Sequence, residues 1–403
     1  MLLKQLKLSS TRQFPEELPI FALTLNFYSS SAYNYVRNIF AKSSPHPKTL
    51  QKWYRSVDGS PGYTQESLRA IKLKVDEMAK ENKKLFVSLI MDEMAIKKHV
   101  QWNGQRQVGY VDLGIQSSNI DTDSLPEAKD ALVFLLVAIN SRWKIPIAYF
   151  LINGLSGKEK SNMVNKSIEI VHGTGAVVVS LTFDGAAANM TMSKELGANL
   201  SRNNLKSYFQ NPVTHDPIFV FIDMCHVIKL LRNALGDWGY FLDDNNNYIK
   251  WSFFKSLVAF QESSGLHAGT KLRQEHINYS KNIMKVKLAV QTFSNSVADA
   301  LDYCNKGLKL PEFYDSEHTS KFCRIINNLF DILNVRNALS KQNYKKPLSK
   351  SNAEFVFNFF EEARQYISII KTANHCLMLD SRRKTGFIGL LVNMQSTEGI
   401  LNY

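Results

Sequence analysis

The sequence contains LFVSLIMD at residues 85–92 and AVVVSLTFD at residues 176–184, two apolar runs that each end in an aspartate. Short β-branched runs bounded by polar residues predict buried strands. A carboxylate at the end of a buried strand lies at the rim of a sheet, where α/β folds tend to place their sites. On neighbouring strands, Asp92 and Asp184 would be able to share divalent metal. Each aspartate taken alone also fits an ordinary cap or turn residue.

The composition indicates a large folded protein with a basic surface. The 403 residues are 44% hydrophobic, which allows two or three domains with sizeable cores. The net charge of +13 favours nucleic acid or another polyanion as a partner, although a basic surface that serves only solubility gives the same charge. No apolar run reaches the length of about 18 residues that a membrane span requires. Four scattered cysteines fit a reducing compartment.

The first 84 residues are basic and helical in pattern, with 14 lysines and arginines against 7 acidic residues. A helix, a proline-rich turn and a short basic, aromatic helix follow one another, as in a helix-turn-helix DNA reader. We expect phosphate contacts from Lys48, Lys52 and Arg55, with Leu50 and Trp53 facing inward. A small helical bundle that only supports its neighbour fits the same pattern.

The pattern changes twice further along the chain. From residue 85, strands, a helix, a strand and a helix follow in the order expected for half of an RNase H-like domain, and several other α/β layouts share this order. Residues 207–372 start with a strand-like run that ends at Asp223. Helices are then predicted at 225–235, 251–261, 268–304, 318–339 and 352–370. The sequence has no P-loop and no glycine-rich dinucleotide fingerprint, so the residues alone do not indicate a nucleotide site.

Six segments, taken together and in this order, resemble P-element-type DNA transposases and their relatives that carry a THAP domain. The likeness extends over roughly residues 12–396. The segments are MDEMAIKK (91–98), GYVDLG (109–114), FDGAAAN (183–189), DMCHVIKLLRN (223–233), KVKLAVQT (285–292) and LFDILNVRN (329–337).

The resemblance implies a multidomain α/β architecture. A helix-turn-helix DNA-binding module would occupy residues 1–84, and the first part of an RNase H-like catalytic domain would occupy 85–206. A helical GTP-binding insertion would follow at 207–372, and the catalytic domain would resume at 373–403.

The resemblance also implies a metal site. Asp92 and Asp184 would be the first two members of a DDE-type triad that holds Mg²⁺ or Mn²⁺. Phosphodiester cleavage needs no covalent enzyme intermediate, since two metal ions about 3.5–4 Å apart clamp the attacking and leaving oxygens. The protein then has to supply the carboxylates that hold these ions.

A second ligand is implied by the insertion, which in the family binds GTP without a P-loop. Its contacts would fall on Lys285, Val286, Asp331 and Asn334 of this sequence. Asp331 is suited to accept hydrogen bonds from the N1–H and N2–H groups of guanine. Helix packing and capping are the alternative roles of these four residues.

Two features of the family are expected to be missing from this sequence. One is the zinc-binding THAP domain, and the other is the third catalytic carboxylate. In the family, that carboxylate follows a segment that corresponds here to RRKTGFIGLLVN at residues 382–393. Glu398 is the nearest acidic residue, but it belongs to a different segment. Loss of one member of a cooperating catalytic set costs orders of magnitude in rate, so we expect weak or absent strand cleavage.

The sequence thus predicts a transposase fragment that is nuclear and homo-oligomeric, binds DNA and GTP, and has no membrane partner. Two alternatives stay open. One is a competent enzyme whose third carboxylate comes from Glu398 or from a partner chain. The other is a non-catalytic, domesticated DNA-binding regulator derived from a transposase.

Overall fold

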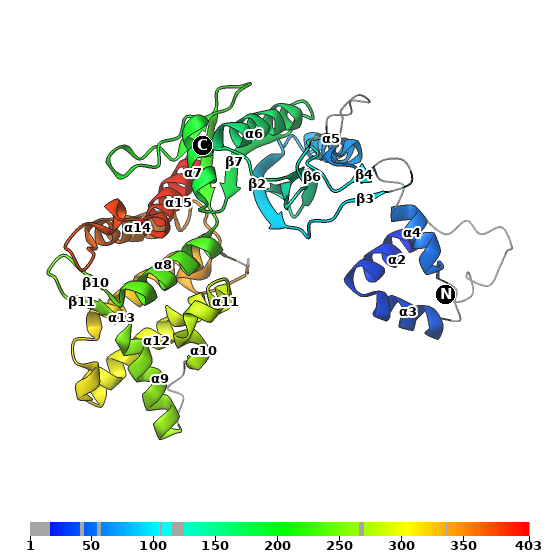
Figure 1. Ribbon diagram of the computed structural model, residues 1–403. Coiled ribbons are helices and arrows are strands. Elements are labelled where there is room, and N and C mark those ends of the chain that lie inside the picture. The colour runs from blue at the N-terminus through cyan, green and yellow to red at the C-terminus, as the bar shows by residue number, and fades with distance from the viewer. Residues whose placement is uncertain are drawn as a thin grey trace.

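A mixed sheet lies at the centre of the computed structural model, which describes residues 17–40, 44–54, 58–102, 104, 107–114, 125–265, 270–335, 337 and 339–402 (Figure 1). The order of its strands is β1-β6-β5-β2-β7-β9-β8. Their bounds are β1 (Gly62–Tyr63), β2 (Phe86–Ala95), β5 (Asp130–Ala138), β6 (Lys144–Ile152), β7 (Val177–Phe183), β8 (Tyr208–Gln210) and β9 (Pro217–Ile222). A small hairpin, β3 (Gln101–Trp102) and β4 (Gln107–Val108), follows β2.

The sheet combines two kinds of pairing. Strand β2 pairs antiparallel with β5 and parallel with β7, and β7 pairs parallel with β9. The sequence suggested that the first strand ends at Asp92, but β2 continues to Ala95 because its pairing with β5 extends that far. Strands β8 and β9 also extend the sheet past residue 206, where we expected the helical insertion to begin.

Helices cover the sheet and connect its strands. Helix α5 (Gln65–Lys80) contacts β6, and α6 (Gly157–His172) packs on β7 and on α7 (Ala187–Glu195). Helix α15 (Thr385–Asn402) packs on β9 and on α8 (Met224–Trp238). Asn393 of α15 accepts the Ile222 N–H and donates to the Ile222 carbonyl, both at 2.8 Å. The end of β9 is therefore fixed by a helix that lies far away in the sequence.

The helical region extends from one end of the sheet (Figure 1). It contains α9 (Ser252–Ser264), α10 (Gln274–Ile277), α11 (Val286–Thr292), α12 (Asn295–Asp302), α13 (Glu317–Leu333) and α14 (Ala353–Ile369), with the hairpin β10 (Tyr240–Leu242) and β11 (Tyr248–Lys250). The single helix predicted over 268–304 is wrong, since the described part of this range forms the separate helices α10, α11 and α12, with a 3₁₀ helix at Tyr279–Asn282 between the first two. The Asn282 side chain donates to the carbonyls of Glu275 and Asn278, and such local bonds compete with a continuous helix.

The N-terminal helices have a core of their own. Helices α2 (Glu17–Tyr28), α3 (Ser30–Ile39) and α4 (Pro47–Tyr54) bury Ala22, Tyr33 and Leu50, apart from the main core. Figure 1 shows these helices set beside the sheet, at the opposite end from the helical region. Over the described ranges, no helix is both long and apolar enough to cross a membrane.

Candidate active site

Three aspartates lie in one row across neighbouring parallel strands. The last paired residues of β2 and β7 are Ile90 and Thr182, and two residues further along each chain come Asp92 and Asp184. Strands β7 and β9 pair up to Phe183 and Ile222, so Asp184 and Asp223 each follow by one residue. The predicted pair therefore shares one sheet edge, and Asp223 adds a third carboxylate from the next strand.

The carboxyl of Asp92 lies in an acidic environment. Partial burial against the sheet edge raises the pKa of Asp92, and the negative charges of Asp184, Asp223 and Glu93 raise it further. The Glu93 N–H donates to Asp92 Oδ1 at 2.9 Å and partly offsets this effect. A carboxylate crowded by like charges is stabilised by a bound cation, so this edge suits a positively charged ligand.

Asp184 is held by the turn that leads into α7. Its Oδ1 accepts the Ala186 N–H at 2.9 Å and the Asn189 side-chain amide at 2.7 Å. Within the described part of the chain, no hydrogen bond reaches its Oδ2. A Cβ on the intervening Gly185 would lie 2.8 Å from Thr385 Cγ2, so only glycine lets α15 approach this turn so closely. The two bonds to Oδ1 thus fix the orientation of the Asp184 carboxylate and leave Oδ2 for a ligand at the sheet edge.

Asp223 is the carboxylate that sequence reasoning left out of the site. Its two oxygens accept the N–H groups of Cys225 and His226, each at 3.0 Å, so it caps the start of α8. The signal was present in the sequence, as a third apolar run that ends in an aspartate. Because that run was assigned to the helical insertion, its pairing with β7, as strand β9, was not expected.

Carboxylate oxygens are ligands that Mg²⁺ and Mn²⁺ prefer, so the donors at this edge fit the expected ions. No group of three or more His, Cys, Asp or Glu side chains is arranged around a metal position in the residues that the structure describes. Glu398, the alternative third ligand, lies on α15, where both of its carboxylate oxygens accept Arg364 Nη2 at 2.9 Å. Glu398 would therefore have to leave this ion pair before it could bind metal.

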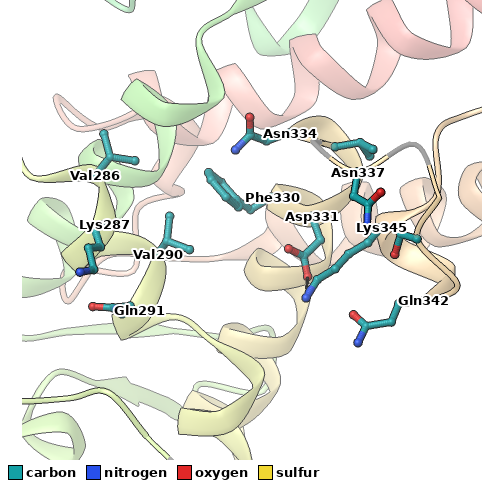
Figure 2. A pocket seen from close by; sticks show the side chains of 12 residues that line it. Val286, Lys287, Val290, Gln291, Phe330, Asp331, Asn334, Asn337, Gln342 and Lys345 are labelled. Atoms are coloured by element: carbon teal, nitrogen blue, oxygen red, sulfur yellow. Dashed lines mark ion pairs between the residues drawn. The ribbon is translucent and has the colours of Figure 1, made fainter. Parts of the chain in front are cut away.

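A second candidate site is a pocket of about 760 Å³ between α11 and the end of α13. Figure 2 shows Lys287, Val290 and Gln291 of α11 on one side. The α13 side carries Phe330, Asp331 and Asn334, with Lys345 and Gln342 from the following loop. Val286, Asp331 and Asn334 therefore line one pocket, as their predicted common role requires. Lys285 is not among the lining residues; it precedes the first residue of α11.

Asp331 has partners of a different kind from those of Asp92. Its Oδ2 accepts the Asn327 side-chain amide at 2.9 Å and lies 3.7 Å from Lys345 Nζ. Burial raises the pKa of Asp331, and Lys345 and Asn327 partly offset the shift. A half-buried carboxylate that already accepts from nitrogen donors is suited to bind a ligand that offers N–H groups.

Two of the predicted DNA-contacting residues, Lys48 and Lys52, lie on α4. Lys48 and Lys52 are exposed, Leu50 is fully buried and Trp53 packs against the small N-terminal core, as the pattern predicted. Arg55 lies outside the described residues. Helix α4 therefore turns two lysines to the solvent, and Leu50 and Trp53 toward the small N-terminal core.

Family models match three parts of the chain. The model described as "Transposable element P transposase-like, HTH domain" matches residues 1–53. The models "TNP-like, RNase H N-terminal domain" and "TNP-like, GTP-binding insertion domain" match residues 59–197 and 225–347. Together they identify the same three kinds of domain, in the same order, as the sequence predicted.

Two curated relatives match almost the whole chain. DNA transposase THAP9 of Homo sapiens is 30% identical over 96% of this chain, and Transposable element P transposase of Drosophila melanogaster is 28% identical over 95%. The chain spans only 42% and 46% of these relatives. A chain of the solved "Drosophila P element transposase strand transfer complex" aligns with a TM-score of 0.75 and 23% identity, covering 100% of this chain and 83% of that chain. This structural likeness confirms the predicted fold.

Proposed function

The chain belongs to the P-element-type transposase family, and from this membership we propose that it binds DNA and GTP and holds Mg²⁺ or Mn²⁺ at the sheet edge for DNA strand cleavage or transfer. The observation that carries the proposal is the row of Asp92, Asp184 and Asp223 across three neighbouring strands. Burial and, to a smaller extent, the neighbouring negative charges raise the pKa of Asp92, and a divalent cation would stabilise its ionised form.

The aspartates would have distinct roles in this chemistry. Asp92 and Asp184 would be the metal ligands, with Asp184 turning Oδ2 toward the ion. Asp223 is engaged in capping α8, so it would contribute negative charge without direct coordination. When bound, divalent metal polarises a phosphodiester and helps to form the attacking hydroxide or alkoxide.

The helical pocket would receive the guanine of GTP. Asp331 would accept from guanine N1–H and N2–H, and Phe330 and Val286 line the same space. When the base binds, the Lys345 ammonium must then either leave Asp331 or shift together with the Asp331 side chain. The volume of about 760 Å³ is adequate for a nucleotide.

DNA would lie against the N-terminal module. Lys48 and Lys52 would contact phosphates, and we keep Arg55 as a third contact from its place in the sequence. Neutralising Lys48 and Lys52 should weaken binding and reduce the slope of log affinity against log salt by about 0.9 for each phosphate that the protein no longer neutralises. Action on chromosomal DNA implies a nuclear location, and we propose a homo-oligomer as the acting form.

One finding favours a second function, that of a non-catalytic DNA-binding regulator. Among the described residues, no three potential ligands surround a metal position. The carboxylate of Glu398 forms an ion pair with Arg364. The metal site would then depend on a ligand from outside the described part of the chain. A regulator would bind DNA without any use of the sheet edge.

Cleavage of a labelled DNA duplex in Mg²⁺ or Mn²⁺, beside an Asp92→Asn/Asp184→Asn control, distinguishes the two functions. Cutting that the control lacks would support the enzyme. Salt-sensitive DNA binding that the double substitution leaves intact, with no cutting by folded protein, would support the regulator.

A further inference from the structure

A buried lysine lies behind the aspartates of the sheet edge. Lys160, in the first turn of α6, has only 3% of its side chain exposed. Its ammonium forms an ion pair with Glu93, the residue after Asp92, and donates to Asn189 Oδ1 at 2.8 Å. One positive charge therefore connects β2, α6 and α7 directly next to the proposed metal ligands.

Local sequence explains how Lys160 reaches this position. Ser156 and Glu159 form a capping box, which fixes where α6 begins and hence which side its first turn presents. A Cβ on Gly157 would lie 2.7 Å from the Thr191 side chain, so glycine at this position lets α6 and α7 pack closely. That close contact brings Lys160 within hydrogen-bonding distance of Asn189.

The hydrogen bonds run in one direction from Lys160 to Asp184. An ammonium only donates, so it requires the carbonyl oxygen of the Asn189 side chain. The amide nitrogen of Asn189 must then face the other way, and it donates to Asp184 Oδ1 at 2.7 Å. Lys160 thereby orients the Asn189 amide so that its nitrogen reinforces the bond from the Ala186 N–H to Asp184 Oδ1.

Stability alone does not account for this lysine. An ammonium loses its hydration on burial, and replacing a buried ion pair by apolar side chains is often neutral or stabilising. The rest of the buried face of α6 includes Val164, Ile168 and Val171, so an apolar residue at position 160 would continue an existing stripe.

We propose that Lys160 is a positioning residue of the metal site, which acts through Asn189 to keep Asp184 Oδ2 turned toward the ion. Its pairing with Glu93 also places a positive charge against a carboxylate that adjoins Asp92. The inference rests on the proposed function, since it assumes that Asp184 holds metal. Neither the resemblance nor the family models gives a role to Lys160.

The test is a Mn²⁺ titration of the full chain, with free Mn²⁺ followed by electron paramagnetic resonance. Substitution of residues that orient metal ligands typically lowers metal affinity by 10–100-fold, so Lys160→Met should lower Mn²⁺ affinity by about 10-fold or more. The matched control is Lys158→Met, which removes an exposed lysine from the same helix and should leave Mn²⁺ affinity unchanged.

A double-mutant cycle separates positioning from general packing. If Lys160 acts through Asn189, Lys160→Met should cost little further affinity in an Asn189→Ala background, because coupled residues are not additive. Asn189→Ala leaves the Lys160–Glu93 ion pair in place and should give a similar loss by itself. It provides the same test in folded protein if Lys160→Met does not fold.

The outcomes distinguish this inference from the proposed function. Wild-type Mn²⁺ affinity retained in folded Lys160→Met, or in Asn189→Ala, would overturn the positioning role while the metal site stands. Strictly additive losses in the cycle would overturn the route through Asn189. A wild-type chain with no Mn²⁺ binding that depends on Asp184 would overturn the proposed metal site itself, and this inference with it.

Discussion

The sheet edge and the helical pocket each contain a carboxyl group whose pKa is raised by burial, but the neighbours of the two groups differ. Asp92 has Asp184, Asp223 and Glu93 beside it, and their negative charges raise its pKa further. Asp331 has Lys345 and Asn327, which lower its pKa. Within the described residues, the side chains whose charges act on Asp92 are all acidic, whereas Asp331 already has side-chain donors that a ligand can replace. The neighbours of each carboxyl group therefore favour a different class of ligand, a cation at Asp92 and an N–H donor at Asp331.

The largest effect that separates the two sites is expected at Asp331. Asp331→Ala removes the charged acceptor of two hydrogen bonds that guanine would donate, each worth about 1.5–3 kcal/mol. GTP affinity should fall by about 100-fold or more in a calorimetric titration, while Mn²⁺ binding at the sheet edge stays as in the wild type. Equal GTP affinity in the two proteins would remove Asp331 from the base site.

A smaller effect is expected from pH. Asp331 must be ionised to accept both guanine N–H groups, and its pKa is raised by burial. GTP affinity should therefore decrease as pH falls, starting at a higher pH than an ordinary aspartate with a pKa of about 3.9 would give. The limiting slope is about tenfold per pH unit. Binding by Asp331→Ala, where it can be measured, should lack this decrease, and a persistent decrease would assign it to another group.

The smallest effect is on stability at the sheet edge. A raised pKa means that folding disfavours the ionised Asp92, so stability is gained as pH falls through the folded-state pKa and is lower at neutral pH. Asp92→Asn should raise the melting temperature at pH 7 by roughly 1–2 °C, since the group is partly exposed and solvent screens its repulsion. A lower melting temperature would contradict the crowding of like charges.

Divalent metal should also distinguish the wild type from Asp92→Asn by its effect on the melting temperature. Mg²⁺ should raise the melting temperature of the wild type, because a ligand that binds only the folded state stabilises it. The same Mg²⁺ should have little effect on Asp92→Asn. Differential scanning fluorimetry with GTP as the second ligand provides the comparison, since GTP should stabilise both proteins equally.

The sequence predicted the parts of both sites that depend on local pattern. Asp92 and Asp184 follow apolar runs, and the parallel register of β2 and β7 brings them together as expected. Val286, Asp331 and Asn334 line one pocket, although only the family resemblance suggested it. Lys285 precedes α11, and the lysine of this segment that lines the pocket is Lys287, because the helix start decides which side chains face inward.

The parts that were missed depend on contacts between distant segments. Asp223 joins the row only because β9 pairs with β7, and no local pattern specifies that neighbour. Lys160 lies on the same stripe of α6 as Val164 and Ile168, which was a signal of burial in the sequence. Its partners, Glu93 and Asn189, come from two other elements, so their meeting required the folded structure.

The most direct test of the central claim is the position of Mn²⁺ in crystals of the protein, located by anomalous scattering at the manganese edge. We predict a peak between the carboxylates of Asp92 and Asp184, on the side of Asp184 Oδ2, that disappears in crystals of Asp184→Asn. A sheet edge without a peak at saturating Mn²⁺, or a peak that survives Asp184→Asn, would contradict the assignment of these aspartates as metal ligands.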